Sequence, residues 1–124
     1  MRTIVVVDDE YSLADVLAAS LSDVGFRVHT AANGVQGLQL VHEHHPDLVL
    51  LDYMMPLLDG PGVLRGLRED PRVASTPVIL ISSLPESSVR TRCDGYAAFL
   101  RKPFAFEALI ATIERVLGGA PPSR

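Results

Sequence analysis

The chain has 124 residues, of which 48% are hydrophobic, and a formal net charge of −4 at pH 7. This length predicts one domain that is large enough to bury a core. The apolar runs are too short to cross a membrane, and an acidic balance without a basic run argues against direct nucleic-acid binding. One cysteine excludes an internal disulfide, and no signal-peptide-like run follows Met1, so we expect a cytoplasmic protein.

Five short apolar segments are predicted to form strands. In chain order they span residues 3–7, 26–30, 47–51, 76–81 and 97–100. The segment 26–30 has mixed polarity, so we expect it at an edge of the sheet. The continuous apolar run at 47–51 is typical of a strand that is buried on both faces.

Segments with helical spacing of apolar residues separate these strands. The predicted helices cover residues 12–24, 33–44, 61–69, 86–93 and 106–117. The first should begin at Ser12 as the N-cap, with Asp15 completing a loose capping box, and Gly25 should end it. The residues expected on the buried faces of the first two helices include Val16, Val24 and Val35.

Two groups of basic side chains lie near predicted helix ends. Three arginines are expected to form a solvent-exposed face: Arg65, Arg68 and Arg72. Three histidines lie where the second helix ends: His42, His44 and His45. Partial positive charge suits a helix C-terminus, and we prefer this interpretation to a metal site.

Strands that alternate with helices predict an α/β fold, a five-stranded parallel doubly wound sheet with helices on both faces. Right-handed crossovers place the C-terminal ends of all strands at one edge. The polar residues that this topology brings together are Asp8, Asp9, Asp52, Ser82 and Lys102. Because Lys102 is the only lysine in the chain, we expect a site that needs a compact ammonium rather than a guanidinium.

The chemistry of this group can be derived from its side chains. Carboxylates gathered in one crevice repel each other unless a cation lies among them. Ligands that are all oxygen suit Mg²⁺, which keeps its waters for a phosphoryl group. A carboxylate can attack phosphorus and form an aspartyl phosphate, while an ammonium and a hydroxyl neutralise the phosphoryl oxygens. The residues therefore predict Mg²⁺-assisted phosphorylation of an aspartate.

Four motifs in order make this interpretation more specific. They are Asp8-Asp9-Glu10, Asp52-Tyr53-Met54-Met55-Pro56 with Asp59-Gly60, Ser82, and Lys102-Pro103-Phe104. Together they resemble the receiver domain of bacterial response regulators, over the chain from Thr3 to Leu117. The resemblance implies a flavodoxin-like fold with strand order 2-1-3-4-5. We expect a receiver domain over residues 1–119 and a tail or linker stub over 120–124.

Carried over residue by residue, the resemblance implies a phosphoacceptor and a Mg²⁺ site. Asp52 would accept the phosphoryl group and contact the metal. Asp9 would bind Mg²⁺ directly and Asp8 would bind it through water. The backbone carbonyl of Met54 would be a further metal ligand.

The resemblance also implies residues that respond to phosphorylation. Ser82 would hydrogen-bond a phosphoryl oxygen, and Lys102 would pair with the phosphoryl group beside a cis bond to Pro103. Ser82 and Phe99 would act as the switch, with Phe99 at a position where the family more often has tyrosine. The segment from Ser82 to Gly95 is short for the family, which predicts a short or mobile fourth helix.

These expectations describe a signalling module. It would take phosphoryl from a sensor histidine kinase or a phosphotransfer protein and would catalyse only its own phosphorylation and dephosphorylation. A downstream protein or a second copy would bind the surface formed by the fourth helix, the fifth strand and the fifth helix, and neither nucleic acid nor a membrane would be contacted.

Three alternatives stay open at this point. The chain could be a complete single-domain regulator or the receiver part of a longer output protein. It could be a haloacid-dehalogenase-type phosphatase, although that family has its nucleophile after the first strand, with a second Asp two residues on where this chain has Glu10. It could also be a degenerate receiver that binds partners without phosphorylation, although no acidic or lysine position is lost.

Overall fold

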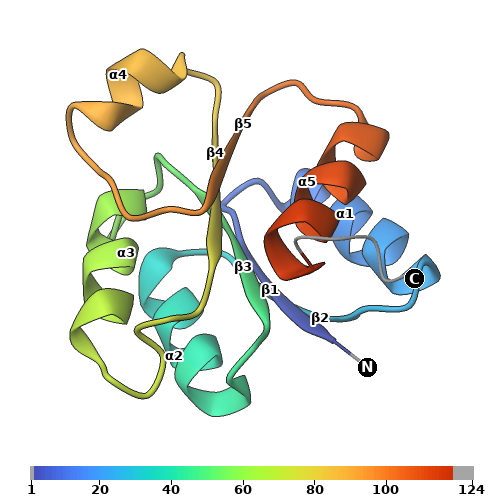
Figure 1. The fold of residues 1–124 in the computed structure, drawn as a ribbon, viewed down its shortest axis with the longest axis horizontal. Helices are drawn as coiled ribbons and strands as arrows, with labels where there is room; N and C mark the ends of the chain where they lie inside the picture. Colours follow the sequence, from blue (N-terminus) through green and yellow to red (C-terminus); the bar gives the residue numbers. More distant parts are fainter. Residues whose placement is uncertain (1, 119–124) are drawn as a thin grey trace.

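One open sheet organises the chain in the computed structural model, which describes residues 2–118 (Figure 1). The sheet has five parallel strands in the order β2-β1-β3-β4-β5. The strands are β1 (Thr3–Val7), β2 (Arg27–Ala31), β3 (Leu48–Asp52), β4 (Val78–Ser82) and β5 (Ala98–Arg101). The predicted fold class and strand order are therefore confirmed.

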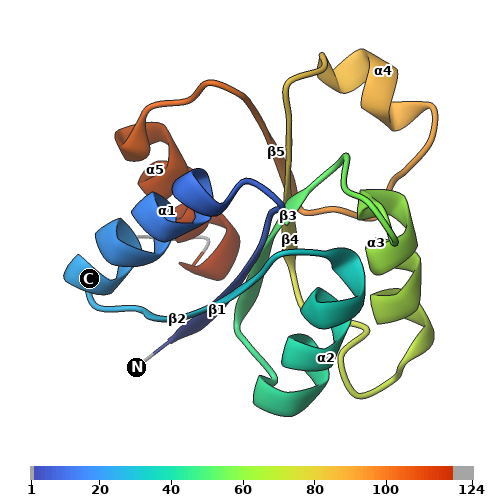
Figure 2. The ribbon, with the colours of Figure 1, turned by 180° about the vertical axis from the view of Figure 1, so that it is seen from behind.

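Helices cover both faces of this sheet. They are α1 (Tyr11–Asp23), α2 (Gly34–His44), α3 (Gly60–Glu69), α4 (Glu86–Arg90) and α5 (Phe106–Gly118). Figures 1 and 2 show α1 and α5 together on one side, with α2, α3 and α4 on the other. Within residues 2–118, no helix combines the length and the apolar character that a membrane crossing requires.

Alternate side chains of the inner strands build two separate cores, as the two-residue period of a strand requires. The core on the side of α2, α3 and α4 includes Val5, Val7, Val49 and Leu51. The core on the side of α1 and α5 includes Ile4, Val6, Leu48 and Leu50. Because both faces are covered, these strands appear in the sequence as continuous apolar runs.

The edge position predicted for the second strand is confirmed. β2 pairs with β1, and of its side chains Ala31 alone is fully buried. β4 begins at Val78 rather than at Thr76. The parallel register places Asp52 of β3 opposite Ile81 of β4 and Ser82 of β4 opposite Arg101 of β5, so the polar strand ends lie at one edge.

The predicted start of α1 is wrong. The helix begins at Tyr11 and its N-cap is Glu10. Within residues 2–118 no side chain caps it, so Ser12 and Asp15 form no capping box. The backbone N–H of Glu10 donates to Asp8 Oδ1 at 2.9 Å. Asp8, which follows β1, therefore turns the chain into the helix two residues earlier than Ser12 would as the N-cap.

Three valines that were predicted on buried helix faces are exposed instead. The exposed fractions are 60% for Val16, 54% for Val24 and 51% for Val35. Small residues take some of the buried positions: Ala14, Gly34 and Gly37. At Gly37 a Cβ would meet Val7 side-chain atoms at 2.8 Å, so the close approach of α2 to β1 leaves no room for a side chain there.

Arg68 is not part of an exposed face, which corrects the prediction for the three arginines. Its guanidinium donates to the carbonyl oxygens of Ala74 at 2.9 Å, Thr76 at 3.0 Å and Gly95 at 2.8 Å. Burial lowers the pKa of this guanidinium. The side chain ties together the two loops that lead into β4 and β5.

The histidines near the end of α2 make contacts with neighbouring side chains. Nε2 of His42 lies 2.6 Å from Asp70 Oδ2, and the His44 ring stacks on His29 with ring centroids 3.8 Å apart. The hydrogen bond from Arg72 holds the pKa of Asp70 well below its usual range. These contacts connect α2 to the C-terminal end of α3 and to β2.

The fourth helix is short, as the resemblance implied. α4 has five residues, and Val89 is the one that it buries. The end of the predicted receiver domain at residue 119 and the predicted stub at 120–124 lie outside the described residues.

Candidate functional site

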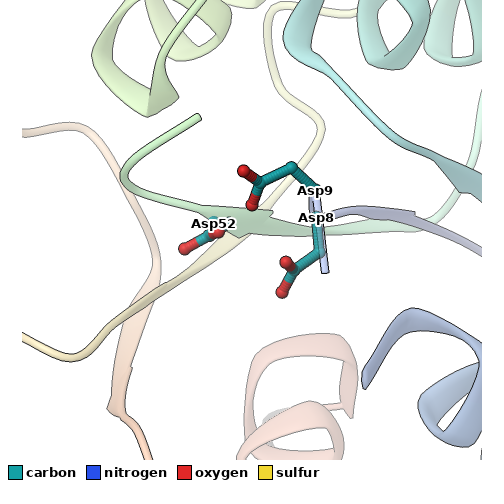
Figure 3. A group of neighbouring side chains, drawn as sticks. All are labelled: Asp8, Asp9 and Asp52. Carbon is teal, nitrogen blue, oxygen red and sulfur yellow. The ribbon is translucent and has the colours of Figure 1, made fainter. Parts of the chain in front are cut away.

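The C-terminal ends of β1 and β3 bring three carboxylates together. Figure 3 shows Asp8 and Asp9, which follow β1, beside Asp52, which ends β3. One carboxylate oxygen from each residue lies within 4.8 Å of the other two. Asp8 and Asp52 are 2% and 6% exposed, whereas Asp9 is open to solvent. Three of the predicted metal ligands are therefore neighbours.

Backbone packing holds Asp52 at this position. The next residue, Tyr53, accepts the N–H of Gly60 on its carbonyl oxygen at 2.8 Å. A Cβ on Gly60 would meet the Tyr53 Cα at 2.8 Å, so only glycine allows this approach. Asp59 begins α3 by accepting the N–H of Gly62 at 3.0 Å. The Asp59-Gly60 motif thus closes the loop onto the strand end that carries Asp52.

The Lys102 ammonium lies among the carboxylates. Its Nζ is 2.8 Å from Glu10 Oε1, 3.3 Å from Asp8 Oδ2 and 3.6 Å from Asp52 Oδ1. Burial alone would lower the pKa of this ammonium. The hydrogen bond to Glu10 and the charges of Asp52 and Asp8 outweigh burial, so the pKa of Lys102 is raised. The lysine is therefore a fixed positive charge at the site.

The electrostatics at Asp52 favour a further cation. Burial and the charge of Asp8 raise the pKa of Asp52 to about 7, although Lys102 counteracts part of this effect. A divalent cation among the three carboxylates would remove their repulsion and favour the ionised form of Asp52. The all-oxygen donor set fits Mg²⁺. The role of the Met54 carbonyl stays a prediction; the Met54 side chain itself is 63% exposed.

Ser82 and Phe99 lie on the neighbouring strands. Ser82 is buried at the end of β4, and its Oγ accepts the N–H of Leu84 at 3.0 Å. Its carbonyl oxygen accepts the N–H of Lys102 at 2.8 Å, and the bond from Lys102 to Pro103 is cis, as the resemblance implied. Phe99 is half-buried and packs against the core on the α2, α3 and α4 side. The switch roles of Ser82 and Phe99 stay predictions.

Two contacts in this region were not predicted. Glu10 was assigned only to the acidic motif, yet it accepts the shortest hydrogen bond of Lys102. On the α4 side, Tyr96 Oη donates to Glu86 Oε2 at 2.9 Å, and its ring centroid lies 6.3 Å from that of Phe99. The position of Glu10, directly after an aspartate pair at a strand end, was a sequence signal that could have predicted its contact with Lys102. No sequence spacing indicates the contact of Tyr96 with Glu86.

Comparison with known proteins agrees with this geometry. Residues 4–114 match the family described as the response regulator receiver domain. The chain is 40% identical over 116 residues to the probable transcriptional regulator ycf27 of Guillardia theta, covering 92% of this chain and 44% of that protein. It is 31% identical over 121 residues to the DNA-binding dual master transcriptional regulator RpaA of Synechocystis sp., covering 94% of this chain and 49% of that protein. The chain therefore spans about half the length of these relatives.

Solved structures give the same picture. The receiver domain of the sensor histidine kinase PA1611 from Pseudomonas aeruginosa superposes with a TM-score of 0.88 at 28% identity, covering 94% of this chain and 98% of that chain. That structure has a magnesium ion coordinated in its active-site cleft. The chemotaxis protein CheY4 of Vibrio cholerae superposes with a TM-score of 0.86 at 29% identity, covering 94% of this chain and 99% of that chain.

The family match covers nearly all of the residues that form the sheet and its helices. A phosphatase of the haloacid-dehalogenase type is not favoured, because the matching relatives are transcriptional regulators and the matching structures are receivers. The chain belongs to the response regulator receiver domain family, the phosphoacceptor domains of two-component signalling.

Proposed function

We propose that Asp52 accepts a phosphoryl group from the phosphohistidine of a sensor histidine kinase or a phosphotransfer protein. The observation that carries this proposal is a buried carboxylate at a strand end, with an ammonium 3.6 Å away and two further carboxylates beside it. An Asp52 oxygen would form a bond to phosphorus while the phosphorus–nitrogen bond to the donor histidine breaks. Lys102 and the Ser82 hydroxyl would then contact phosphoryl oxygens.

We also propose that Mg²⁺ is the cofactor. Asp8, Asp9, Asp52 and the Met54 carbonyl would hold it, and the close approach of the first three carboxylates supports this assignment. When bound, the metal would neutralise charge on the phosphoryl oxygens during transfer. A second support is electrostatic: burial and the charge of Asp8 raise the pKa of Asp52, and a divalent cation at this position would favour its ionised form.

The output would be a change in the surface formed by α4, β5 and α5, read by a downstream protein or by a second copy of the chain. The chain would act on no other substrate and would catalyse only its own phosphorylation and dephosphorylation. DNA binding is named for RpaA as a whole protein, of which this chain covers 49%, so direct nucleic-acid contact is not part of this proposal. The domain limits at residues 1–119 and the cytoplasmic location stay predictions.

Incubation with Mg²⁺ and acetyl phosphate, followed by intact mass spectrometry, tests the assignment. The wild type should gain one phosphoryl group, and both EDTA and Asp52→Ala should abolish the gain. Asp9→Ala should also abolish it, because an acidic pocket without its metal repels the donor. Asp15→Ala, which removes an exposed acid on α1, is the matched control and should be labelled like the wild type.

Two outcomes would contradict the proposal. Full labelling of Asp52→Ala would place the phosphoryl group on another residue. A wild type that stays unlabelled with Mg²⁺, by acetyl phosphate and by a phosphorylated kinase alike, would instead favour a degenerate receiver.

A further inference from the structure

Glu10 is the nearest partner of the only lysine in the chain. Lys102 Nζ donates to Glu10 Oε1 at 2.8 Å, which is shorter than its distance to either Asp8 or Asp52. We propose that Glu10 is a positioning residue that holds the Lys102 ammonium away from the phosphoryl position at Asp52 and thereby slows phosphorylation. This inference rests on the proposed function, in which Asp52 is the phosphoacceptor.

The distances define which carboxylate the ammonium binds before phosphorylation. At 3.6 Å from Asp52 Oδ1, Lys102 Nζ is beyond hydrogen-bond length, whereas 2.8 Å to Glu10 is a charge-assisted hydrogen bond. The Lys102 side chain is 17% exposed and that of Glu10 is 59% exposed. Glu10 therefore holds the ammonium from the open mouth of the site, and Asp52 lies at the buried end.

A phosphoryl group on Asp52 would compete with Glu10 for the same ammonium. Lysine is a compact charge on a flexible stem, so its Nζ can turn from one acceptor to another. The described contacts of this Nζ are with carboxylates of Glu10, Asp8 and Asp52. Asp8 and Asp52 are predicted metal ligands, and Asp52 is also the predicted nucleophile, whereas Glu10 is neither. With Mg²⁺ bound, the Glu10 carboxylate would therefore still compete with the phosphoryl group for the Lys102 ammonium.

The side chain of Glu10 can be changed without removing a structural contact of α1. Glu10 is the N-cap residue, but its side chain makes no capping hydrogen bond. The bond from its backbone N–H to Asp8 Oδ1 does not depend on the side chain. Glu10→Gln thus removes the charge and keeps the shape of the side chain, including an oxygen that can accept a hydrogen bond from Lys102. Glu10→Ala removes that oxygen as well.

Asp15 provides a matched control for general repulsion of an anionic donor. It is an exposed acid on the first turns of α1 and lines a cavity that also contains Asp8 and Tyr11. Among the described residues, it makes no ion pair with Lys102. Asp15→Asn therefore removes the same charge from the same side of the site without changing the lysine contact.

The experiment measures the ion pairing of Lys102 and the rate of phosphorylation separately. Protein labelled with ¹⁵N-lysine has one side-chain ammonium resonance, since Lys102 is the only lysine. Ion pairing slows the exchange of its protons with water, so the resonance should be visible in the wild type and in Asp15→Asn. It should broaden or disappear in Glu10→Gln and Glu10→Ala.

Phosphorylation by acetyl phosphate with Mg²⁺ gives the second readout. Both Glu10 variants should be labelled about two- to fivefold faster than the wild type, the range that corresponds to an exposed ion pair. Asp15→Asn should change the rate less. In a Lys102→Met background, Glu10→Gln should have no accelerating effect, because the residue through which it acts is gone.

The outcomes separate this inference from the proposed function. The inference about Glu10 is overturned if Glu10→Ala is phosphorylated no faster than the wild type, or if Asp15→Asn accelerates phosphorylation equally. It is also overturned if the lysine resonance is unchanged in both Glu10 variants. If the wild type cannot be labelled, the proposed function fails. The lysine resonance then still decides whether Glu10 holds Lys102.

Discussion

Lys102 Nζ lies 3.6 Å from Asp52 Oδ1, farther from it than from either Asp8 or Glu10. The space between these carboxylates accommodates an ammonium, whereas a guanidinium is larger and planar. Lys102→Arg should therefore be labelled at Asp52 in the presence of Mg²⁺ but should show a reduced structural response. Intact mass gives the labelling, and amide chemical shifts over α4, β5 and α5 give the response.

Arg65→Lys, at an exposed position on α3, is the control for a change between lysine and arginine outside the site. It should respond like the wild type. If Lys102→Arg shows the full chemical-shift change on phosphorylation, the site is less restrictive than these distances indicate.

The raised pKa of Asp52 makes the stability of the metal-free protein depend on pH. Its carboxyl has a pKa near 3.8 when unperturbed and about 7 in the folded chain. Between these values the folded state binds more protons than the unfolded state, so the free energy of unfolding falls as pH rises. The loss between pH 5 and pH 8 should be on the order of a few kcal/mol at most.

Urea unfolding in EDTA at the two pH values measures this effect. Asp52→Asn should remove most of the decrease, because the amide does not titrate. Mg²⁺ should restore the stability of the wild type at pH 8, since it binds the folded state. A pH dependence that is the same in Asp52→Asn and in the wild type would assign the titration to another group.

Arg68 should contribute to stability although it lies on an outer helix. Its guanidinium donates to three backbone carbonyls in the loops before β4 and β5. Arg68→Met should lower the free energy of unfolding by about 1.5–3 kcal/mol, as expected for lost hydrogen bonds to a charged group. Arg65→Met, an exposed position on the same helix, should change it by less than about 0.5 kcal/mol. Similar small losses in both variants would show that the three contacts are weak.

Tyr96 should connect the predicted movement of Phe99 to α4. Its ring centroid lies 6.3 Å from that of Phe99, and its hydroxyl donates to Glu86 in the first turn of α4. Phosphorylation should draw Ser82 toward the phosphoryl group and let Phe99 fill the space behind it. Tyr96→Phe keeps the ring and removes the hydroxyl, so Asp52 should be labelled normally.

The chemical-shift change of the α4 amides on phosphorylation should be smaller in Tyr96→Phe. Glu86→Gln should reproduce this loss in part, whereas Ser87→Ala, at an exposed position on α4, should not. Unchanged α4 shifts in Tyr96→Phe would show that the hydroxyl contact plays no part in the response.

The strands and the position of the site could be predicted from the sequence because burial on both faces leaves a strong signal. Continuous apolar runs marked β1, β3 and β4, and the polar residue after each run marked the site edge. The start of α1 could not be predicted from local capping patterns, since the Asp8 carboxylate binds the Glu10 N–H and turns the chain before Ser12.

Contacts between distant elements were not predictable from spacing. The exposed Val16 lies on a helix that buries Ala14 and Leu17, so apolar character alone did not identify the buried face. The sequence predicts that an arginine on the polar face of an amphipathic helix is solvent exposed. It does not indicate that the loops before β4 and β5 bring their carbonyl groups to Arg68. The Glu10 contact with Lys102 likewise depends on the side-chain positions at the site.

The phosphorylated state should be comparatively long-lived, because the residues beside Asp52 provide little to orient a hydrolytic water. Met54 and Leu84 line one cavity of about 410 Å³ next to Tyr53, and their exposed fractions are 63% and 38%. A thioether is only a weak acceptor and leucine has no polar atom, so neither can direct water toward phosphorus. The polar residues that line the same cavity are Asp59, Ser88 and Arg92. Arg92 can only donate hydrogen bonds, Asp59 Oδ1 already accepts the N–H of Gly62, and Ser88 lies on α4 rather than in the loops that carry Met54 and Leu84.

The decay of phosphorylated protein after removal of acetyl phosphate measures this lifetime. Met54→Asn should decay faster than the wild type, and Met54→Asn/Leu84→Glu should decay faster still, because each change replaces apolar cover with a group that binds water. Leu57→Asn is the matched control, since Leu57 is 82% exposed in the same loop as Met54 but does not line the cavity. A wild type that decays as fast as Met54→Asn/Leu84→Glu would show that Met54 and Leu84 do not keep water from the phosphoryl group. Faster decay in Leu57→Asn would assign the effect to the polarity of the loop in general.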